Sequence, residues 1–275
     1  MSLKGYIKEN LPWIRSIYRK RLAPINLIHN IFDKPIVVLL YHRVNYLNRD
    51  LFNINVTPDN FERHIRILKN HYNVINFNDL KRNDIKESSV IITFDDGYYD
   101  NYKYAFPILK KYQVPATIFI TSGGVDTGKE FWWDRLETVL FENKNLRESI
   151  ELDILNQRHI FDVSDDKKRL HSFYTLHHML FSLHPNERDM MLDRWYESYG
   201  LKVNPNNRTM TSSELIELYQ SQLVTLGAHT IHHPALKQIS REEQIQEIQS
   251  SKLFLENLLH TDIDIFAYPF GHKES

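Results

Sequence analysis

Short apolar segments alternate with longer amphipathic segments over most of the chain. The apolar segments are rich in β-branched residues and apolar on both faces, as expected for strands that are covered on both sides. They comprise residues 35–41, 74–77, 89–94, 116–120, 223–229 and 264–269. Because helical patterns lie between them, the sequence predicts an α/β fold with parallel strands, in an open sheet or a barrel.

Two of the helical patterns have clear features. Residues 57–72 begin with Thr57 or Asp59 as a cap and place apolar side chains on one face. Residues 101–113 form a second helical pattern, which is interrupted only by Pro107. These helices are expected to cover the sheet.

The stretch from about residue 123 to residue 202 departs from this alternation. It predicts a helix, then a hairpin around Asn156 and Gln157, then two further helices. We expect an insertion that is carried on the barrel and is long enough to form a lid or subdomain. The insertion contains four histidines that fit no closed metal-binding pattern, so a metal role for them is not favoured. They are His171, His177, His178 and His184.

Composition limits the possible chemistry but does not identify a function. The 275 residues are 42% hydrophobic, which is enough for one large domain with a substantial core or for two small ones. The 34 basic and 35 acidic residues give a net charge of −1, so no overall field attracts nucleic acid. The chain has no cysteine but has 14 histidines, so any metal site must use oxygen and nitrogen ligands.

Residues 1–34 form a segment of their own. They lack the apolar core of a secretory signal, and no part of the sequence reaches about 18 consecutive apolar residues, so we predict a cytoplasmic protein. A short basic amphipathic helix is expected after Pro12. It could make weak peripheral contact with an inner membrane, but packing against its own domain is favoured because one short helix binds lipid weakly.

Two adjacent carboxylates, Asp95 and Asp96, follow the apolar segment 89–94 directly. In a parallel α/β fold the carboxyl ends of strands line the functional face, and neighbouring residues there point in different directions. One carboxylate can then bind a metal while the other acts as a base. Gly97 allows a sharp turn or the close approach of a ligand. The alternative is a pair that caps the following helix.

Three histidines follow the segment 223–229 in the same way. His229 stands at the strand end, and His232 and His233 follow about one turn later. Together with Asp96, His229 and one of the other two would supply three ligands and leave a coordination position for water. Carboxylate and imidazole ligands favour zinc, or another first-row divalent metal, over magnesium or calcium. The spacing alone leaves His232 and His233 as alternatives.

The combination of "TFDDG" (93–97), "HTIHHPAL" (229–236) and "YPFG" (268–271) resembles the polysaccharide deacetylases, also called carbohydrate esterase family 4 or the NodB homology domain. The resemblance covers residues 35–275 apart from the insertion, and it implies a distorted (β/α) barrel. It also implies Asp95 as general base, Asp96, His229 and His233 as metal ligands, and Phe270, next to Pro269, as the donor of a backbone N–H to the oxyanion.

Two positions depart from the family's pattern. Ala267 stands where many members have an arginine that orients the base. The family's histidine acid, in a Leu-x-x-His motif, normally follows the third motif, whereas this sequence has "LLYH" at residues 39–42. Members resembling poly-N-acetylglucosamine deacetylases are permuted in this way, so His42 is implied as the general acid. A histidine bonded to the barrel rim is the alternative, and Arg43 is expected at the surface or in substrate binding.

The resemblance implies a metal-dependent deacetylase that acts on an N-acetylated polysaccharide or glycan intermediate. Tyr98 is expected near the substrate, where its ring could stack on a sugar, whereas Trp132 and Trp133 are expected in the core of the insertion. Since Gly271 lies close to the last residue, Ser275, we also expect the C-terminal end of the barrel to be missing. A catalytically impaired glycan-binding protein and an O-acetyl esterase are the alternative functions.

Overall fold

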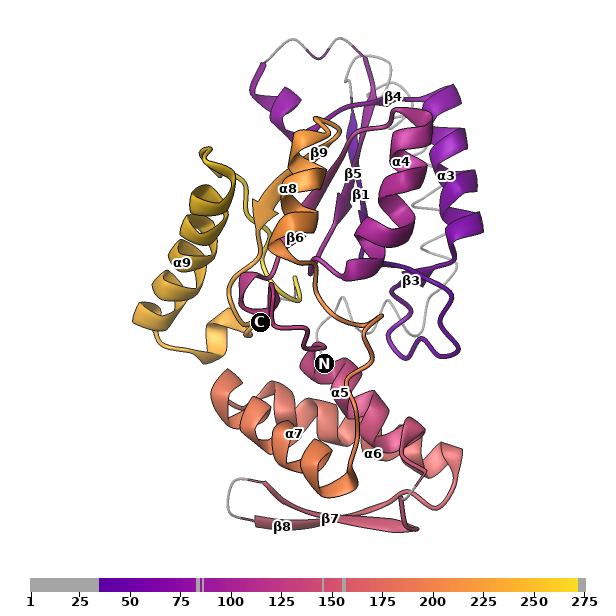
Figure 1. Cartoon of the computed structure of the whole chain (residues 1–275), viewed down its shortest axis with the longest axis vertical. Helices are drawn as coiled ribbons and strands as arrows, with labels where there is room; N and C mark the ends of the chain where they lie inside the picture. The colour runs from indigo at the N-terminus through magenta and orange to yellow at the C-terminus, as the bar shows by residue number, and fades with distance from the viewer. Residues whose placement is uncertain (1–34, 83–84, 86, 145, 155–156, 272–275) are drawn as a thin grey trace, which may run out of the picture.

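The computed structural model describes residues 35–271, apart from residues 83–84, 86, 145 and 155–156 (Figure 1). The amphipathic helix predicted within residues 1–34 lies outside the described residues. Within the described part of the chain, no helix combines the length and the apolar character needed to cross a membrane.

A parallel sheet forms the centre of the larger part of the molecule. Its strands are β1 (Ile36–Tyr41), β5 (Ser89–Phe94), β6 (Ala116–Ile120) and β9 (Val224–Ala228) in that order, and β4 (Asn73–Val74) pairs with the start of β5. Every residue of β5 and β6 is buried, which explains why both read as unbroken apolar segments. The predicted parallel α/β fold is confirmed.

The outer segments of the sheet are shorter than predicted. The segment expected at 74–77 contributes only β4, because Asp79 accepts a hydrogen bond from Asn76 N and a 3-10 turn follows. The segment 264–269 makes a single parallel bridge, between Phe266 and Ala228. In residues 35–271, as far as they are described, no hydrogen-bonded ladder joins this segment to β1. The strands therefore form an arc, as in a distorted barrel.

Helices cover this arc on two sides (Figure 1). α3 (Pro58–His71) and α4 (Phe106–Tyr112) lie together on one side, and α8 (Ser212–Gln220) and α9 (Arg241–Leu259) lie against β9. Thr57, rather than Asp59, caps α3, since its hydroxyl accepts a hydrogen bond from Asn60 N at 3.4 Å. Residues Asn101–Ala105 form a π-helical turn just before Pro107, which has no N–H to continue a regular ladder.

The predicted insertion forms a second layer, drawn below the sheet in Figure 1. It contains α5 (Trp132–Glu137) with a π-helical turn (Thr138–Glu142), the hairpin of β7 (Ser149–Ile154) and β8 (Gln157–Asp162), α6 (Asp166–Phe181) and α7 (Pro185–Tyr199). These elements share a hydrophobic core that is distinct from the core around the sheet. Trp132 and Trp133 belong to it, as predicted.

Short elements complete the described chain. A two-residue parallel pair, β2 (Arg43–Val44) and β3 (Asn55–Val56), follows β1. The 3-10 turns are Phe77–Arg82, Ser122–Gly124 and Leu236–Gln238.

Candidate metal centre and catalytic cavity

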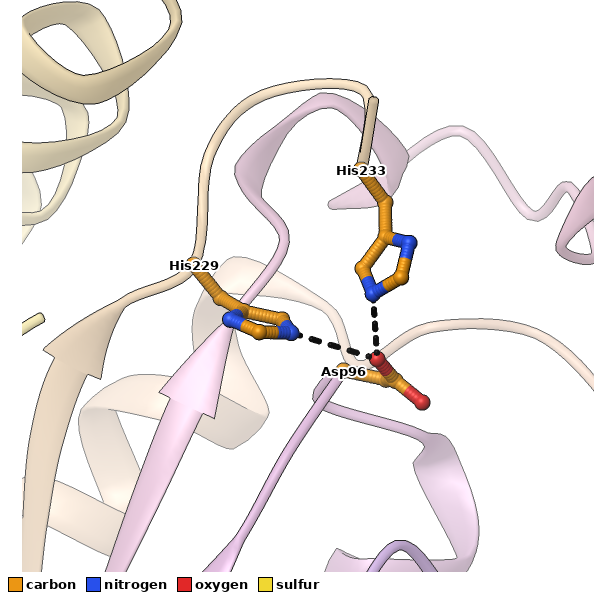
Figure 2. Close-up of side chains that lie close together, drawn as sticks. All are labelled: Asp96, His229 and His233. Atoms are coloured by element: carbon orange, nitrogen blue, oxygen red, sulfur yellow. Dashed lines mark ion pairs between the residues drawn. The ribbon is translucent and has the colours of Figure 1, made fainter. Parts of the chain in front are cut away.

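Three side chains from two strand ends converge on one point (Figure 2). Asp96 follows β5, and His229 and His233 lie in the segment after β9. Oδ1 of Asp96 lies 3.5 Å from Nε2 of His229 and 3.2 Å from Nε2 of His233. All three side chains are buried. The residues predicted as metal ligands are therefore brought together in a protected position.

The geometry of these side chains fits a single divalent cation. One ligand atom from each residue lies within 4.8 Å of the other two. A tetrahedral ion with bonds of about 2.0–2.1 Å separates its ligands by about 3.3–3.4 Å, close to the two separations measured from Asp96. One carboxylate and two imidazoles form a donor set that suits zinc or another first-row metal.

A hydrogen bond to the backbone orients one histidine of this triad, His229. Nδ1 of His229 lies 2.9 Å from the carbonyl oxygen of Ala267, which can only accept, so Nδ1 donates and Nε2 faces Asp96. The backbone of Ala267 thus holds His229 in place, at the position where the resemblance implied an arginine that orients the base. His232 points elsewhere, because its Nδ1 lies 2.7 Å from Oε1 of Glu247. The structure therefore selects His233 over His232.

Burial and neighbouring charges set the protonation states of the triad. Burial by itself would raise the pKa of Asp96, but the contacts with His229 and His233 outweigh it and hold that pKa well below its usual range. Burial lowers the pKa of His233, although Asp96 opposes the change, whereas at His229 the contact with Asp96 outweighs burial and raises the pKa. An ionised carboxylate and a neutral imidazole are the forms that bind a metal ion.

The backbone is left-handed at several residues around the triad, including Thr230 between the two histidines, which has φ 66°. Asp96 has φ 72°, His233 has φ 52° and Phe270 has φ 62°, a region that residues with a side chain seldom occupy. Gly97 follows with φ 80°, where a Cβ would lie 3.0 Å from Cδ1 of Ile120. The chain therefore turns sharply after β5.

A cavity of about 450 Å³ opens beside the triad. It is lined by Leu40, His42, Phe52, Ile54, Asp95, Asp96, Trp133, His177, His229, His233, Tyr268, Phe270 and Gly271. Asp95 and His42, predicted as base and acid, thus lie at the same cavity as the triad. Burial raises the pKa of Asp95 despite the opposing charge of His229, and a raised pKa makes a carboxylate a better proton acceptor.

Of the other residues predicted to contact the substrate, Phe270 lines the cavity, whereas Pro269 and Tyr98 do not. Phe270 lines the cavity, and its ring centroid lies 4.5 Å from that of His233. Pro269 is buried and is not among the lining residues; its carbonyl accepts a hydrogen bond from Gly271 N in the turn that positions Phe270. The prediction for Tyr98 is wrong, since its side chain is fully buried and its hydroxyl bonds to Asp134 at 2.8 Å.

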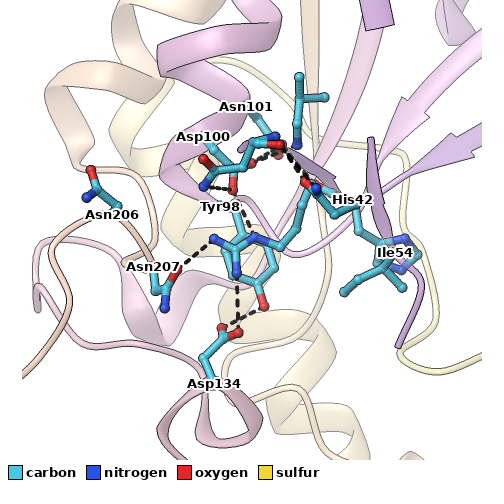
Figure 3. A network of polar contacts seen from close by, with 12 residues as sticks. His42, Ile54, Tyr98, Asp100, Asn101, Asp134, Asn206 and Asn207 are labelled. Atoms are coloured by element: carbon cyan, nitrogen blue, oxygen red, sulfur yellow. Dashed lines mark hydrogen bonds and ion pairs between the residues drawn. The ribbon is translucent and has the colours of Figure 1, made fainter. Parts of the chain in front are cut away.

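A buried polar network lies directly behind His42 (Figure 3). Arg43 is 3% exposed, contrary to the expected surface or substrate position. Its guanidinium lies 2.8 Å from Asp100, 3.3 Å from Asp134 and 2.9 Å from Oδ1 of Asn207. It thereby connects the end of β1 with the π-helical turn and the insertion.

This network also holds the backbone on both sides of Arg43. Nδ2 of Asn101 donates to the carbonyl oxygen of His42 at 2.8 Å, and Val44 N donates to Asp100 at 3.1 Å. Because the peptide units on either side of Arg43 are bonded in this way, the network fixes the backbone that carries the His42 imidazole to the cavity. Sequence spacing gave no sign of it.

Comparison with known proteins gives matches to polysaccharide deacetylases. The model of the family described as "Polysaccharide deacetylase" matches residues 82–145 and 190–275. The chain is 38% identical over 96 residues to the putative polysaccharide deacetylase YxkH of Bacillus subtilis, over 32% of this chain and 33% of that protein. It is 36% identical over 106 residues to a poly-beta-1,6-N-acetyl-D-glucosamine N-deacetylase of Staphylococcus aureus, over 32% of this chain and 37% of that one.

Solved structures with a similar fold include two deacetylases of low sequence identity. IcaB from Ammonifex degensii has a TM-score of 0.54 and 18% identity, with 87% of this chain and 76% of that chain covered. The Streptococcus pyogenes deacetylase PplD has a TM-score of 0.51 and 20% identity, with 86% and 74% covered. These likenesses concern the fold, and the matches to the curated relatives span only about a third of their length.

Proposed function

The chain belongs to the polysaccharide deacetylase family, and we propose that it is a metal-dependent hydrolase that removes N-acetyl groups from a glycan and releases acetate. One observation carries this proposal: the candidate metal ligands, the carboxylate of Asp95 and the imidazole of His42 all line one cavity. A cation site, a base and an acid are the groups needed to hydrolyse an amide, which is a poor electrophile with a poor leaving group.

In the proposed reaction, Asp95 accepts a proton from the attacking water, whose oxygen forms a bond to the acetyl carbon. The bond between that carbon and the sugar nitrogen then breaks, and His42 donates a proton to the departing amine. In this proposal the backbone N–H of Phe270, a residue that lines the cavity, donates to the oxyanion of the tetrahedral intermediate. A divalent cation held by Asp96, His229 and His233 would polarise the acetyl carbonyl and lower the pKa of a bound water.

The proposed substrate class follows from the relatives. The Staphylococcus aureus relative is named as a deacetylase of poly-β-1,6-N-acetyl-D-glucosamine, so we include oligomers of N-acetylglucosamine as the first substrate to test. The cytoplasmic location stays a prediction from the N-terminal pattern, and the membrane contact predicted for residues 1–34 falls outside the described residues.

Acetate release tests the proposal directly. Zinc-loaded protein is incubated with N-acetylglucosamine oligomers, and acetate is measured by an enzyme-coupled assay. We expect release by the wild type, loss in Asp95→Asn and no change in Asp153→Asn, which alters an exposed aspartate of the hairpin.

Two other results would point to a different function. Acetate from an O-acetylated sugar, with none from the N-acetylated oligomers, would identify an esterase. Binding of the oligomers without any acetate release would identify a glycan-binding protein. Full activity in the absence of any bound divalent metal would refute the metal-dependent mechanism.

A further inference from the structure

The insertion supplies part of the cavity wall. Trp133 of α5 and His177 of α6 both line the cavity, although they belong to the insertion and the triad lies at the strand ends. His177 lies in residues 146–189, which fall between the two segments matched by the family model. The family match therefore does not account for this residue, although it borders the same cavity as Asp95.

Aromatic side chains fix the ring of His177. It stacks on Trp132, with ring centroids 4.7 Å apart and an angle of 27° between the planes, and the ring of Phe52 lies 4.9 Å away. Phe173 and Phe181 of the same helix lie 6.1 Å and 6.5 Å away. The ring is held by contacts from α5, α6 and the loop before β3, so its orientation is set before any ligand binds.

The same surroundings keep His177 uncharged. Burial lowers the pKa of His177 to about 4, and the nearby positive charges of His178 and Arg188 act in the same direction. At neutral pH the ring therefore has one nitrogen that donates and one that accepts a hydrogen bond. Such a group suits a hydroxyl or amide of a sugar, which can do both.

The polar atoms of His177 have no protein partner. In the described part of the chain neither ring nitrogen makes a hydrogen bond, and neither is among the buried polar atoms that are sealed from solvent. These nitrogens face the cavity without a protein partner, so they are available to hydrogen-bond water or a ligand that enters it.

The remaining lining residues limit the kind of partner. They include aromatic rings from Phe52, Trp133 and Phe270 and two carboxylates, but among the described lining residues there is no lysine or arginine. Apolar rings suit the C–H face of a sugar, and a lining without lysine or arginine offers no basic side chain to bind the carboxylate or phosphate of an anionic one. The cavity therefore matches an uncharged sugar better than a uronate or a phosphorylated sugar.

We infer that His177 is a specificity-determining residue, which hydrogen-bonds a hydroxyl or amide of an uncharged N-acetylated sugar and orients it towards the metal centre. This inference rests on the proposed function and adds the insertion to the substrate site. The residue acts on the bound sugar and takes no part in breaking the amide bond.

The test separates hydrogen bonding from stacking. His177→Phe keeps an aromatic ring and loses both polar atoms, whereas His177→Gln keeps polar atoms and loses the ring. His178→Phe, on the exposed neighbour in α6, is the matched control. Thermal unfolding and zinc affinity of each variant confirm that the fold and the triad are intact.

For acetate release from N-acetylglucosamine oligomers, we expect His177→Phe to raise KM about tenfold with kcat within about threefold, as for one lost hydrogen bond to the substrate. His177→Gln should recover part of this loss, and the control should match the wild type. A KM within twofold of wild type in His177→Phe, or an equal change in His178→Phe, would overturn the inference.

If the proposed function is wrong, the contact between His177 and the sugar is tested by binding instead. If zinc-loaded wild type releases no acetate, calorimetric titration with the same oligomers replaces the kinetic assay. Binding about tenfold weaker in His177→Phe would still support the contact, whereas equal binding, or no binding by the wild type, would refute it.

Discussion

Replacing Arg43 by methionine removes the cation that pairs with Asp100 and Asp134 in the buried network behind His42. The guanidinium lies 2.8 Å from Asp100 and 3.3 Å from Asp134, and its Cζ lies 4.2 Å from the centroid of the Tyr98 ring. Methionine retains much of the apolar stem but leaves both carboxylates without their counter-charge. The side chains of Arg43, Asp100 and Asp134 are all at least nine-tenths buried, so water does not replace the lost interaction.

Breaking a buried pair by removing one partner typically destabilises a protein by about 3–5 kcal/mol. Here one cation serves two carboxylates, so we expect Arg43→Met to lower the free energy of unfolding by an amount in that range. This is a large fraction of the ~5–15 kcal/mol that ordinarily separates folded from unfolded states. Adding Asp134→Asn to the variant should restore part of the loss, because it removes one of the two uncompensated charges.

The decrease in the free energy of unfolding caused by Arg43→Met should also depend on pH. Burial raises the pKa of Asp134 to about 7 even though Arg43 opposes the change, so without Arg43 this pKa rises further. At pH 6 the carboxyl group of the variant then takes up a proton and sheds its charge, whereas at pH 9 it cannot. Arg43→Met is therefore expected to be less destabilising at pH 6 than at pH 9.

Urea unfolding followed by tryptophan fluorescence measures these differences, because Trp133 donates a hydrogen bond to the hydroxyl of Tyr98 at the edge of the network. Zinc is held at one concentration throughout, since a metal that binds only the folded state would shift the result. Arg158→Met, which breaks an exposed pair with Glu151, is the control and should have no measurable effect. An effect of Arg43→Met as small as that of the control, or one independent of pH, would refute the reasoning.

Four further outcomes are expected. Asp95→Asn should reduce acetate release by about 10²–10⁴-fold and leave zinc affinity unchanged by calorimetry; equal loss of zinc would contradict its role as a base. Zinc at about 100 times its Kd should stabilise the wild type by about 2.7 kcal/mol in urea unfolding, and Asp96→Asn should abolish this gain. Phe61→Ala should cost about 3–5 kcal/mol by the same method, since Phe61 is fully buried between Tyr41 and Phe94. Folding raises the pKa of Asp134 from 3.8 to about 7. The contribution of Asp134 to the free energy of unfolding should therefore be complete below about pH 4 and should disappear as the pH rises through 7. Asp134→Asn should flatten the dependence of the free energy of unfolding on pH in this range.

The central strands and the triad could be predicted because their signals are local. A strand buried on both faces is apolar at every position, and the polar residues that follow β5 and β9 are placed at one edge by the parallel sheet. Spacing left His232 and His233 equivalent, and only the fold separates them, through the contact between His232 and Glu247 in α9.

The network around Arg43 could not be predicted from sequence because its partners are distant along the chain. They lie 57, 91 and 164 residues away, in three separate parts of the chain. His177 was missed for a related reason. Its helical pattern shows an ordinary insertion helix, and nothing local indicates that the insertion folds back to the cavity. For Tyr98, proximity to Asp96 in sequence suggested the substrate, but the sharp turn at Gly97 directs its ring into the insertion core.

The left-handed backbone at Asp96, His233 and Phe270 has a consequence for protein engineering. Each such residue carries a steric penalty of about 1–3 kcal/mol that glycine would avoid. A random library selected only for heat resistance should therefore accumulate glycine at these three positions, and the selected proteins would lose two of the three candidate metal ligands, Asp96 and His233. Selection for heat resistance and selection for turnover thus favour opposite residues here, so stabilising substitutions are better sought in the core of the insertion.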